Sequence, residues 1–287
     1  MPPTPLPPRR TGHPPSESLI AERTAIMANL RTCPFDSRCA IDEQVIGGVT
    51  CVVLTPPAPR AHLIHFHGGG YRYSSPDRVI GFLSAIAADS EIEMIVPAYS
   101  LAPEAPFPNA LYEGRAVIDA VSADPDGWPL LIGGDSAGGG LALALTASRD
   151  PAQALAGMFL ISPWLDLTLS ADAYRRNAER DPIFSETISA GCVADYLQGA
   201  DPKDPFASPL FASFERVPPT LVVAGTGERL VDDSIAFARA LGEQQIRVTL
   251  ELVPEMEHVA PLLDPSLPGA AEARRAIRRF LFDQVPD

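Results

Sequence analysis

From residue 40 onward, short apolar runs alternate along the chain with longer amphipathic stretches. Two of the runs flank Gly47-Gly48 and predict an antiparallel hairpin, Ala40–Ile46 with Val49–Leu54. Further buried strands are expected at His62–Phe66, Met94–Val96, Leu130–Ile132, Met158–Ile161, Leu221–Ala224 and Val248–Val253. Helices are expected at Arg78–Asp89, Ala110–Ser122, Gly138–Ala147, Ser234–Leu241 and Ala270–Phe282. This alternation favours an α/β fold with a mostly parallel central sheet and helices on both faces.

The same pattern divides the chain into a core and two flanking parts. Residues 1–39 are expected to form a proline-rich tail, extended or mobile, and then a helix at Ser18–Leu30 capped by Ser16 or Ser18. Residues 40–164 and 218–287 are the two parts of the core. Residues 165–217 lack a strand signal, which predicts an inserted helical cap, completed by the N-terminal helix. The alternative is a long surface excursion with no role at the site.

Composition and charge limit the partners that the chain can bind. Of 287 residues, 46% are hydrophobic and 20% charged, which is enough apolar material for a large core. A net charge of −14 at pH 7 argues against nucleic acid and anionic membranes as partners and mildly disfavours acidic substrates. The N-terminus lacks the apolar segment of a secretory signal, and no run approaches the ~20 residues needed to span a bilayer. The expected location is the cytoplasm, where the expected free thiols are Cys33, Cys39, Cys51 and Cys192.

The most informative motif is G-x-S-x-G, formed by Gly134, Ser136 and Gly138. It lies between an expected strand and an expected helix, which is the context that a nucleophile elbow requires. In such an elbow a sharp turn exposes the serine oxygen, and side chains at the two glycine positions would collide with the neighbouring strand and helix. Without that context the motif predicts only a turn. Here it predicts that Ser136 is a catalytic nucleophile.

A second glycine-rich turn follows the strand that ends at Phe66. Glycines leave backbone N–H groups free to bind a tetrahedral oxyanion, at roughly 3 kcal/mol per donor. The expected oxyanion donors are the N–H groups of Gly69, Gly70 and Ala137. The neighbouring residues expected to contact substrate are Gly68, Tyr71 and Asp135.

Chain order identifies the base for the nucleophile. Of the five histidines only His258 follows Ser136, and in this fold the order is serine, acid, histidine. The acid is then expected after the strand Leu221–Ala224, where Glu228 is the first carboxylate. Its task is to fix one imidazole tautomer and stabilise the imidazolium that forms. Asp232 remains the alternative acid, with Glu228 then serving only to pair with a neighbour or cap a helix.

Several motifs in correct order resemble the hormone-sensitive-lipase group of bacterial-type carboxylesterases. The resemblance covers roughly residues 40 to 280. The matching segments are His67–Gly70 (H-G-G-G), Gly134–Gly139 (G-D-S-A-G-G), Tyr99–Pro108, Ser162–Leu167 and Asp204–Leu210. The resemblance implies the α/β-hydrolase fold, a cap over the site, Glu228 as the acid and His258 as the base. Ala98 and Ser100 depart from the Asp and Arg that usually flank the family's tyrosine.

The expected function is that of a serine carboxylesterase acting through an acyl-enzyme. The substrate implied by the family is a small-molecule ester, a short-to-medium acyl ester of a neutral alcohol or a lactone, with no metal or organic cofactor. A homodimer through an exposed edge strand is a further hypothesis. One alternative is a metallohydrolase using His62, His65 and His67, although strand alternation places His62 on the opposite face. The other is a binding protein on the same scaffold.

Overall fold

The expected strands form a single sheet in the computed structural model, which describes residues 4–29, 32–123, 127–150, 153–181, 183–215 and 217–285. Among these residues the sheet has eight strands in the order β1-β2-β4-β3-β5-β6-β7-β8. The strands are β1 (Ala40–Ile46), β2 (Val49–Thr55), β3 (Ala61–Phe66), β4 (Ile92–Pro97), β5 (Leu130–Asp135), β6 (Gly157–Ile161), β7 (Thr220–Gly225) and β8 (Val248–Val253). Each predicted strand is confirmed to within three residues at either end.

The direction of the strands decides where chemistry can be placed. β1 and β2 form the predicted antiparallel hairpin, and β2 also runs antiparallel to β4. The remaining strands, β4, β3, β5, β6, β7 and β8, run parallel to one another. Because parallel strands end at the same edge, the turns after β3, β5, β6, β7 and β8 lie along one edge of the sheet.

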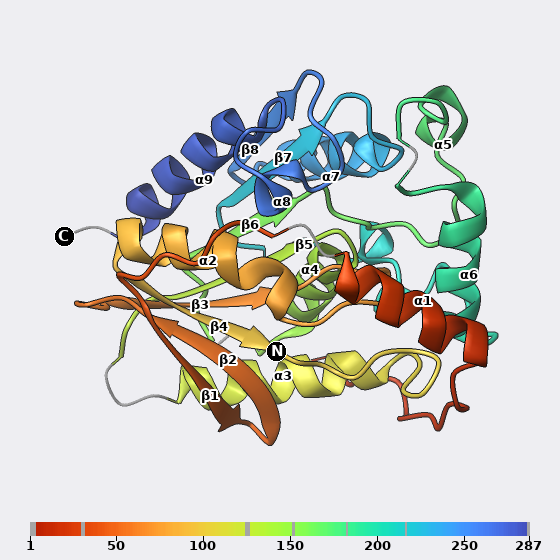
Figure 1. The fold of residues 1–287 in the computed structure, drawn as a ribbon, viewed down its shortest axis with the longest axis horizontal. Coiled ribbons are helices and arrows are strands. Elements are labelled where there is room, and N and C mark those ends of the chain that lie inside the picture. The colour runs from red at the N-terminus through yellow and green to blue at the C-terminus, as the bar shows by residue number, and fades with distance from the viewer. Residues whose placement is uncertain are drawn as a thin grey trace.

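Helices cover both faces of the sheet, as predicted (Figure 1). Alternate side chains of each strand belong to opposite layers: Ile64 and Phe66 of β3 pack with one buried cluster, and Leu63 with the other. The first cluster includes residues of α3, α4 and α7, and the second includes residues of α2, α8 and α9. The helices are α1 (Glu17–Ala28), α2 (Asp77–Ser90), α3 (Asn109–Ser122), α4 (Ala137–Ser148), α5 (Ala173–Arg176), α6 (Glu186–Leu197), α7 (Val231–Glu243), α8 (Ala260–Leu263) and α9 (Ala270–Gln284).

The N-terminal segment is extended and held against the surface of the core. Arg10 donates hydrogen bonds to the carbonyl oxygens of Leu197 and Gln198 at 2.7 and 2.6 Å, and the N–H of His13 donates to Pro103. Of the two capping serines considered, Ser16 caps α1 by accepting from the N–H of Leu19. The end of the predicted helix, Leu30, and residues 1–3 of the predicted tail lie outside the described residues.

Between β6 and β7 the chain leaves the sheet and forms a helical excursion. It contains α5, α6 and a short 3-10 helix, η1 (Pro209–Phe211), and no strand among its described residues. Ser185 caps α6 by accepting from the N–H of Ile188. In the described part of the chain, none of the helices combines the length and the apolar character needed to cross a membrane.

Candidate active site

Ser136 occupies the sharp turn between β5 and α4. Its backbone has φ 50° and ψ −122°, a conformation that residues with a side chain rarely adopt. Gly138 makes the turn feasible, because a Cβ there would collide with the carbonyl oxygen of Phe66 at the end of β3. The carbonyl of Ser136 accepts from the N–H groups of Gly139 and Trp164 at 3.0 and 2.9 Å, which fixes the turn on both sides. The geometry is that of a nucleophile elbow.

Three side chains from three strand ends form a hydrogen-bonded chain. His258, in the turn after β8, has Nε2 3.0 Å from Ser136 Oγ. Its Nδ1 lies 3.1 Å from Glu228 Oε2, in the turn after β7. A carboxylate accepts hydrogen bonds, so Nδ1 carries the proton and Nε2 is left to accept from the serine hydroxyl. The residues are 122 and 30 positions apart in the chain and almost completely buried.

Glu228 is held by its second carboxylate oxygen. Oε1 accepts from the N–H of Gly225 at 2.6 Å and from the hydroxyl of Ser162 at 2.8 Å. Ser162 also accepts from the N–H of Val259, so it connects the turn of the acid to the turn of the histidine. Sequence reasoning assigned no role to Ser162. The available signal was its place directly after β6, at the same edge of the sheet as the other three residues.

The alternative acid lies elsewhere. Asp232 pairs with Arg176 at 2.6 Å and accepts from the N–H of Ala173, both in the excursion between β6 and β7. Asp233 accepts from the backbone N–H of Leu165 at 2.8 Å, and burial raises its pKa to about 7. Both aspartates therefore attach α7 to the excursion, and Glu228 is the carboxylate beside His258.

The environment of His258 suits a base that must also become a cation. Burial by itself lowers the pKa of its imidazole, because a dry site disfavours the charged form. The hydrogen bond and the negative charge of Glu228 raise that pKa by more, so the pKa of His258 lies above its ordinary value. The acid therefore stabilises the imidazolium that proton transfer from Ser136 would produce.

The three expected oxyanion donors surround one side of Ser136. Among the described residues, the N–H groups of Gly69, Gly70 and Ala137 have no acceptor within the protein. Gly69 has φ +113°, and a Cβ there would collide with the carbonyl oxygen of Tyr73. Gly69 and Gly70 both line the cavity that opens on Ser136. The arrangement leaves backbone donors available to an oxygen bound beside the serine.

Of the three residues expected to contact substrate, only Asp135 lines that cavity. Gly68 and Tyr71 do not line it, and their contact with substrate stays a prediction. The carbonyl of Gly68 accepts from His67 Nδ1 at 2.8 Å, and the Tyr71 ring stacks on Tyr196 with centroids 3.9 Å apart. Gly68 nevertheless lies close to the nucleophile, since a Cβ there would be 3.1 Å from the Cβ of Ser136.

Asp135 itself is buried and paired. Its Oδ1 lies 3.1 Å from Nε2 of His65, and its Oδ2 has no partner among the described residues. Burial by itself raises the pKa of Asp135. The hydrogen bond and charge of His65 lower that pKa by more, so the pKa lies below its ordinary value and the carboxyl stays ionised. The three histidines of β3 and the turn after it do not converge: His62 lies beside Glu93 and His65 beside Asp135. The described residues contain no cluster of His, Cys, Asp or Glu arranged to hold a metal ion.

The cavity that opens on Ser136 has a volume of about 580 Å³. One wall comes from α1 and another from α6 and the residues before it, and apolar side chains predominate on both. The residues that form these two walls include Ala25, Ile26, Ile183, Phe184, Ile188 and Cys192. All four cysteines, Cys192 included, are free and buried.

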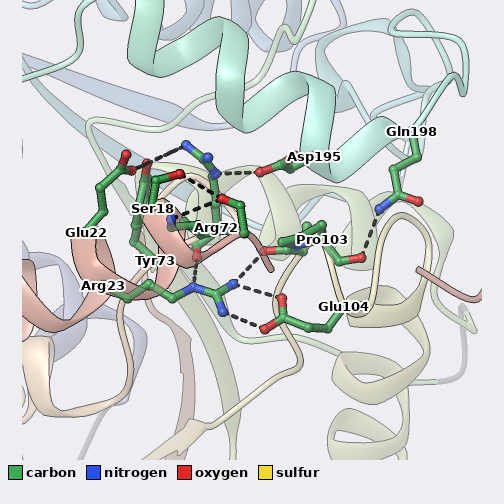
Figure 2. A network of polar contacts seen from close by, with 12 residues as sticks. Ser18, Glu22, Arg23, Arg72, Tyr73, Pro103, Glu104, Asp195 and Gln198 are labelled. Carbon is green, nitrogen blue, oxygen red and sulfur yellow. Dashed lines mark hydrogen bonds and ion pairs between the residues drawn. The ribbon is translucent and has the colours of Figure 1, made fainter. Parts of the chain in front are cut away.

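Charged side chains tie the glycine turn to these walls (Figure 2). Arg72 donates to Asp195 of α6 at 2.5 Å and lies 3.8 Å from Glu22 of α1. The hydroxyl of Tyr73 donates to the same Glu22 at 2.8 Å, and Arg23 of α1 donates to the carbonyl of Arg72 at 2.9 Å. The helices α1 and α6 are therefore joined through Arg72 and Tyr73, which follow the expected oxyanion donors Gly69 and Gly70 in the chain.

Comparison with known proteins agrees with this geometry. A family model described as alpha/beta hydrolase fold matches residues 63–262. The esterase of Acinetobacter venetianus is 32% identical over 260 residues, which cover 87% of this chain and 84% of that protein. The crystal structure of an esterase from the bacterial hormone-sensitive lipase family superposes with a TM-score of 0.87 at 29% identity, covering 95% of this chain and 94% of that one. The chain belongs to the hormone-sensitive lipase family of α/β-hydrolases.

The relatives also establish the type of reaction. The acetyl-hydrolase of Streptomyces hygroscopicus is 36% identical over 246 residues, which cover 82% of this chain and 79% of that protein. Together with the esterases, this similarity identifies the chain as a carboxylic ester hydrolase. The predicted fold and enzyme class are thereby confirmed.

The departure beside the family's tyrosine has a local explanation. Tyr99 is buried, and its hydroxyl donates to the carbonyl of His67 at 2.6 Å, which supports the end of β3. On the next residue, the N–H and hydroxyl of Ser100 donate to the carboxylate of Glu113 at 2.6 and 2.7 Å. Glu113 on α3 thus fixes this turn through Ser100.

Proposed function

We propose that this enzyme is a serine carboxylesterase in which Ser136 is the nucleophile, His258 the general base and acid, and Glu228 the orienting acid. The observation that carries the proposal is the chain of contacts from Ser136 Oγ through His258 to Glu228, at 3.0 and 3.1 Å. It is built in the strained turn of an elbow and beside unpaired backbone donors, as nucleophilic acyl transfer requires.

The reaction follows from these positions in two steps. His258 Nε2 takes the proton of the Ser136 hydroxyl while Oγ forms a bond to the ester carbonyl carbon. The carbonyl oxygen becomes an oxyanion, which the N–H groups of Gly69, Gly70 and Ala137 stabilise. His258 then gives its proton to the leaving alcohol, and the acyl group stays on Ser136. Water repeats the cycle: its proton passes to His258 and then to Oγ, and the carboxylic acid is released.

The cavity supports short-to-medium acyl esters as substrates. Its volume of about 580 Å³ and its apolar walls fit a small ester, since burial of each methylene contributes about 0.8 kcal/mol. A lactone undergoes the same two steps, with the leaving alcohol and the acid on one molecule. An acetyl group is at the short end of this range, and one relative is an acetyl-hydrolase.

We further propose that α1 and the excursion over residues 165–217 act together as the cap of the site. Both line the cavity, and both are tied to the glycine turn by Arg72 and Tyr73. A cap of this kind excludes water from the ester and limits the length of the acyl chain.

The test is hydrolysis of p-nitrophenyl acetate, butyrate, octanoate and palmitate by the wild type and by Ser136→Ala. The wild type is expected to prefer the shorter esters, and the variant to lose roughly 10⁴-fold or more in kcat. Circular dichroism checks that the variant is folded. A folded Ser136→Ala variant that keeps its activity would exclude Ser136 as the nucleophile.

A further inference from the structure

Among the described residues, two arginines line the cavity, and their surroundings differ. Arg72 is neutralised by Asp195 and Glu22, as Figure 2 shows. Arg78, in the first turn of α2, lines the same cavity as Ser136 and His258 but forms no ion pair or side-chain hydrogen bond with the described residues. Its Nε is buried and has no partner.

An unpaired guanidinium in this position is unusual. Arginine keeps its charge at any physiological pH and presents five N–H donors with no acceptor. A buried donor without a partner is costly to a folded protein, and a charged one more so. The N-terminus of α2, a helix of 14 residues, adds its partial positive charge at the same place. Asp77 in the same first turn is exposed and accepts from the hydroxyl of Ser75 at 2.7 Å. This wall of the cavity therefore has a buried donor, Arg78 Nε, for which the described residues supply no acceptor.

The charge of Arg78 reaches the catalytic residues. It lowers the pKa of the ionised Asp135 and opposes the rise in the pKa of His258. Of the carboxylates on the cavity, Glu22 contacts Arg72 and Tyr73. Asp135 contacts His65 through Oδ1, whereas its Oδ2 has no hydrogen-bond partner among the described residues.

Besides Asp77, a second acidic residue near Arg78 is Glu257. It shares a hollow of about 420 Å³ with Arg78, beside the main cavity. Glu257 is exposed to solvent and forms no ion pair with Arg78. The guanidinium therefore remains available on the side that faces Ser136.

We propose that Arg78 binds a carboxylate carried by the ester substrate, so that the enzyme prefers anionic esters over neutral esters of the same size. This inference rests on the proposed function of Ser136. The carboxylate belongs either to the acyl side, as in a half-ester of a dicarboxylic acid, or to the alcohol side, as in an ester of a hydroxy acid. In both cases it lies a few bonds from the scissile carbonyl and pairs with the guanidinium through two parallel hydrogen bonds.

The overall negative charge does not oppose this inference strongly. A net charge of −14 repels an approaching anion over long distances, which affects the rate of encounter. At 0.15 M ionic strength, charges more than ~8 Å apart are largely screened, whereas a direct contact with a half-buried guanidinium is not. Binding in the cavity is therefore governed by the local cation.

The test compares kcat/KM for matched esters. On the acyl side, the p-nitrophenyl half-ester of glutaric acid is paired with p-nitrophenyl hexanoate. On the alcohol side, 3-(butyryloxy)benzoate is paired with 3-(butyryloxy)benzamide. The variants are Arg78→Met, Arg78→Lys and, as a control with the same change of net charge, Arg239→Met. Arg239 lies on α7, outside the cavity lining, and pairs only with the exposed Glu243.

Arg78→Met is expected to lower kcat/KM for the anionic member of one pair by roughly ten- to a hundredfold, the effect of one charged hydrogen-bonding contact. The neutral member should change little, Arg78→Lys should restore part of the loss, and Arg239→Met should match the wild type. Which pair responds identifies the side that carries the carboxylate. Added salt should reduce the anionic preference of the wild type but not that of Arg78→Met.

An equal loss on both members would overturn the proposal, because Arg78 would then act on the oxyanion or as a counter-charge to Asp135. No loss on either pair would also overturn it. Calorimetric binding of the glutarate half-ester to Ser136→Ala, with and without Arg78→Met, measures the contact without turnover. If the wild type hydrolyses neither the neutral nor the anionic esters, the proposed function fails, and this binding measurement still decides the role of Arg78.

Discussion

The catalytic edge of the sheet and the walls that face it are built by different contacts. At the edge, Ser136, Glu228 and His258 each lie in the turn after a strand, and hydrogen bonds with backbone groups fix these turns. In the walls, charged side chains of α1, α6 and the glycine turn meet across long stretches of sequence. The catalytic edge is almost completely buried, and several hydrogen bonds fix each of its residues. The walls instead depend on partly exposed ion pairs. Changes at the edge should therefore reduce catalysis, and changes in the walls should alter substrate binding.

The sharpest test of the edge, after the nucleophile itself, is Glu228→Gln. It keeps the shape of the side chain but removes the charge that raises the pKa of His258. We expect kcat to fall by about 10³- to 10⁴-fold, as when the acid of a serine protease triad is replaced by an amide. Asp232→Asn is the matched control, since Asp232 pairs with Arg176 and lies away from His258. An equal decrease in kcat in the two variants would show that Glu228 is not the orienting acid.

The same pair of variants predicts a change in pH dependence. His258 must be neutral to accept the serine proton, so activity falls as pH drops through its pKa. In the wild type that pKa is raised, and the acid limb of kcat/KM lies above the ordinary histidine value of about 6.5. Without the charge of Glu228 the pKa decreases, so the acid limb should move to lower pH in Glu228→Gln and stay in place in Asp232→Asn.

A smaller effect on the edge is expected for Ser162→Ala. The change removes the hydroxyl that donates to Glu228 at 2.8 Å and accepts from Val259. Loss of a hydrogen bond to a charged group predicts a decrease in kcat of roughly ten- to a hundredfold, with KM little changed. Ser148→Ala removes another buried hydroxyl, at the end of α4, and should retain wild-type kcat. A Ser162→Ala enzyme with normal kcat would mean that Gly225 alone holds the acid.

The smallest effect belongs to the walls. Asp195→Asn removes the main charge partner of Arg72, a pair with side chains 17% and 22% exposed. A partly exposed ion pair contributes up to about 1 kcal/mol, which corresponds to a rise in KM of roughly fivefold. The kcat should stay near that of wild type. Asp172→Asn breaks the fully exposed pair with Arg175 and should change neither constant. A fall in kcat without a rise in KM would mean that Asp195 supports catalysis and not substrate binding.

Local patterns sufficed for the parts of the site whose position depends on strand ends. The strands, the elbow at Ser136 and the order of Ser136 and His258 could be predicted, because a buried strand and a glycine turn are properties of neighbouring residues. The choice between Glu228 and Asp232 was harder to make from the sequence, since both follow β7 within a few residues. Glu228 lies in the turn before α7 and contacts the imidazole, whereas Asp232 lies in the first turn of α7 and pairs with Arg176. Which of the two meets His258 depends on how α7 packs.

Residues whose role comes from distant partners could not be placed in advance. Ser162 acts through Glu228, 66 positions away, and Arg72 through Asp195, 123 positions away. The stacking of Tyr71 on Tyr196, which is distant in the sequence, could not be predicted for the same reason. Arg78 belongs to no sequence motif. It stands out only in the folded protein, where its buried Nε has no hydrogen-bond partner among the described residues.

The sequence by itself therefore determined the α/β architecture, because strand periodicity and turn glycines act over short distances. It also predicted Ser136 as the nucleophile and His258 as the base, from the elbow motif and from residue order. Only the tertiary structure decided which carboxylate meets His258, which side chains form the cavity and which arginine remains unpaired. Burial and electrostatic pairing are properties of groups brought together from distant parts of the chain, and no local pattern records them.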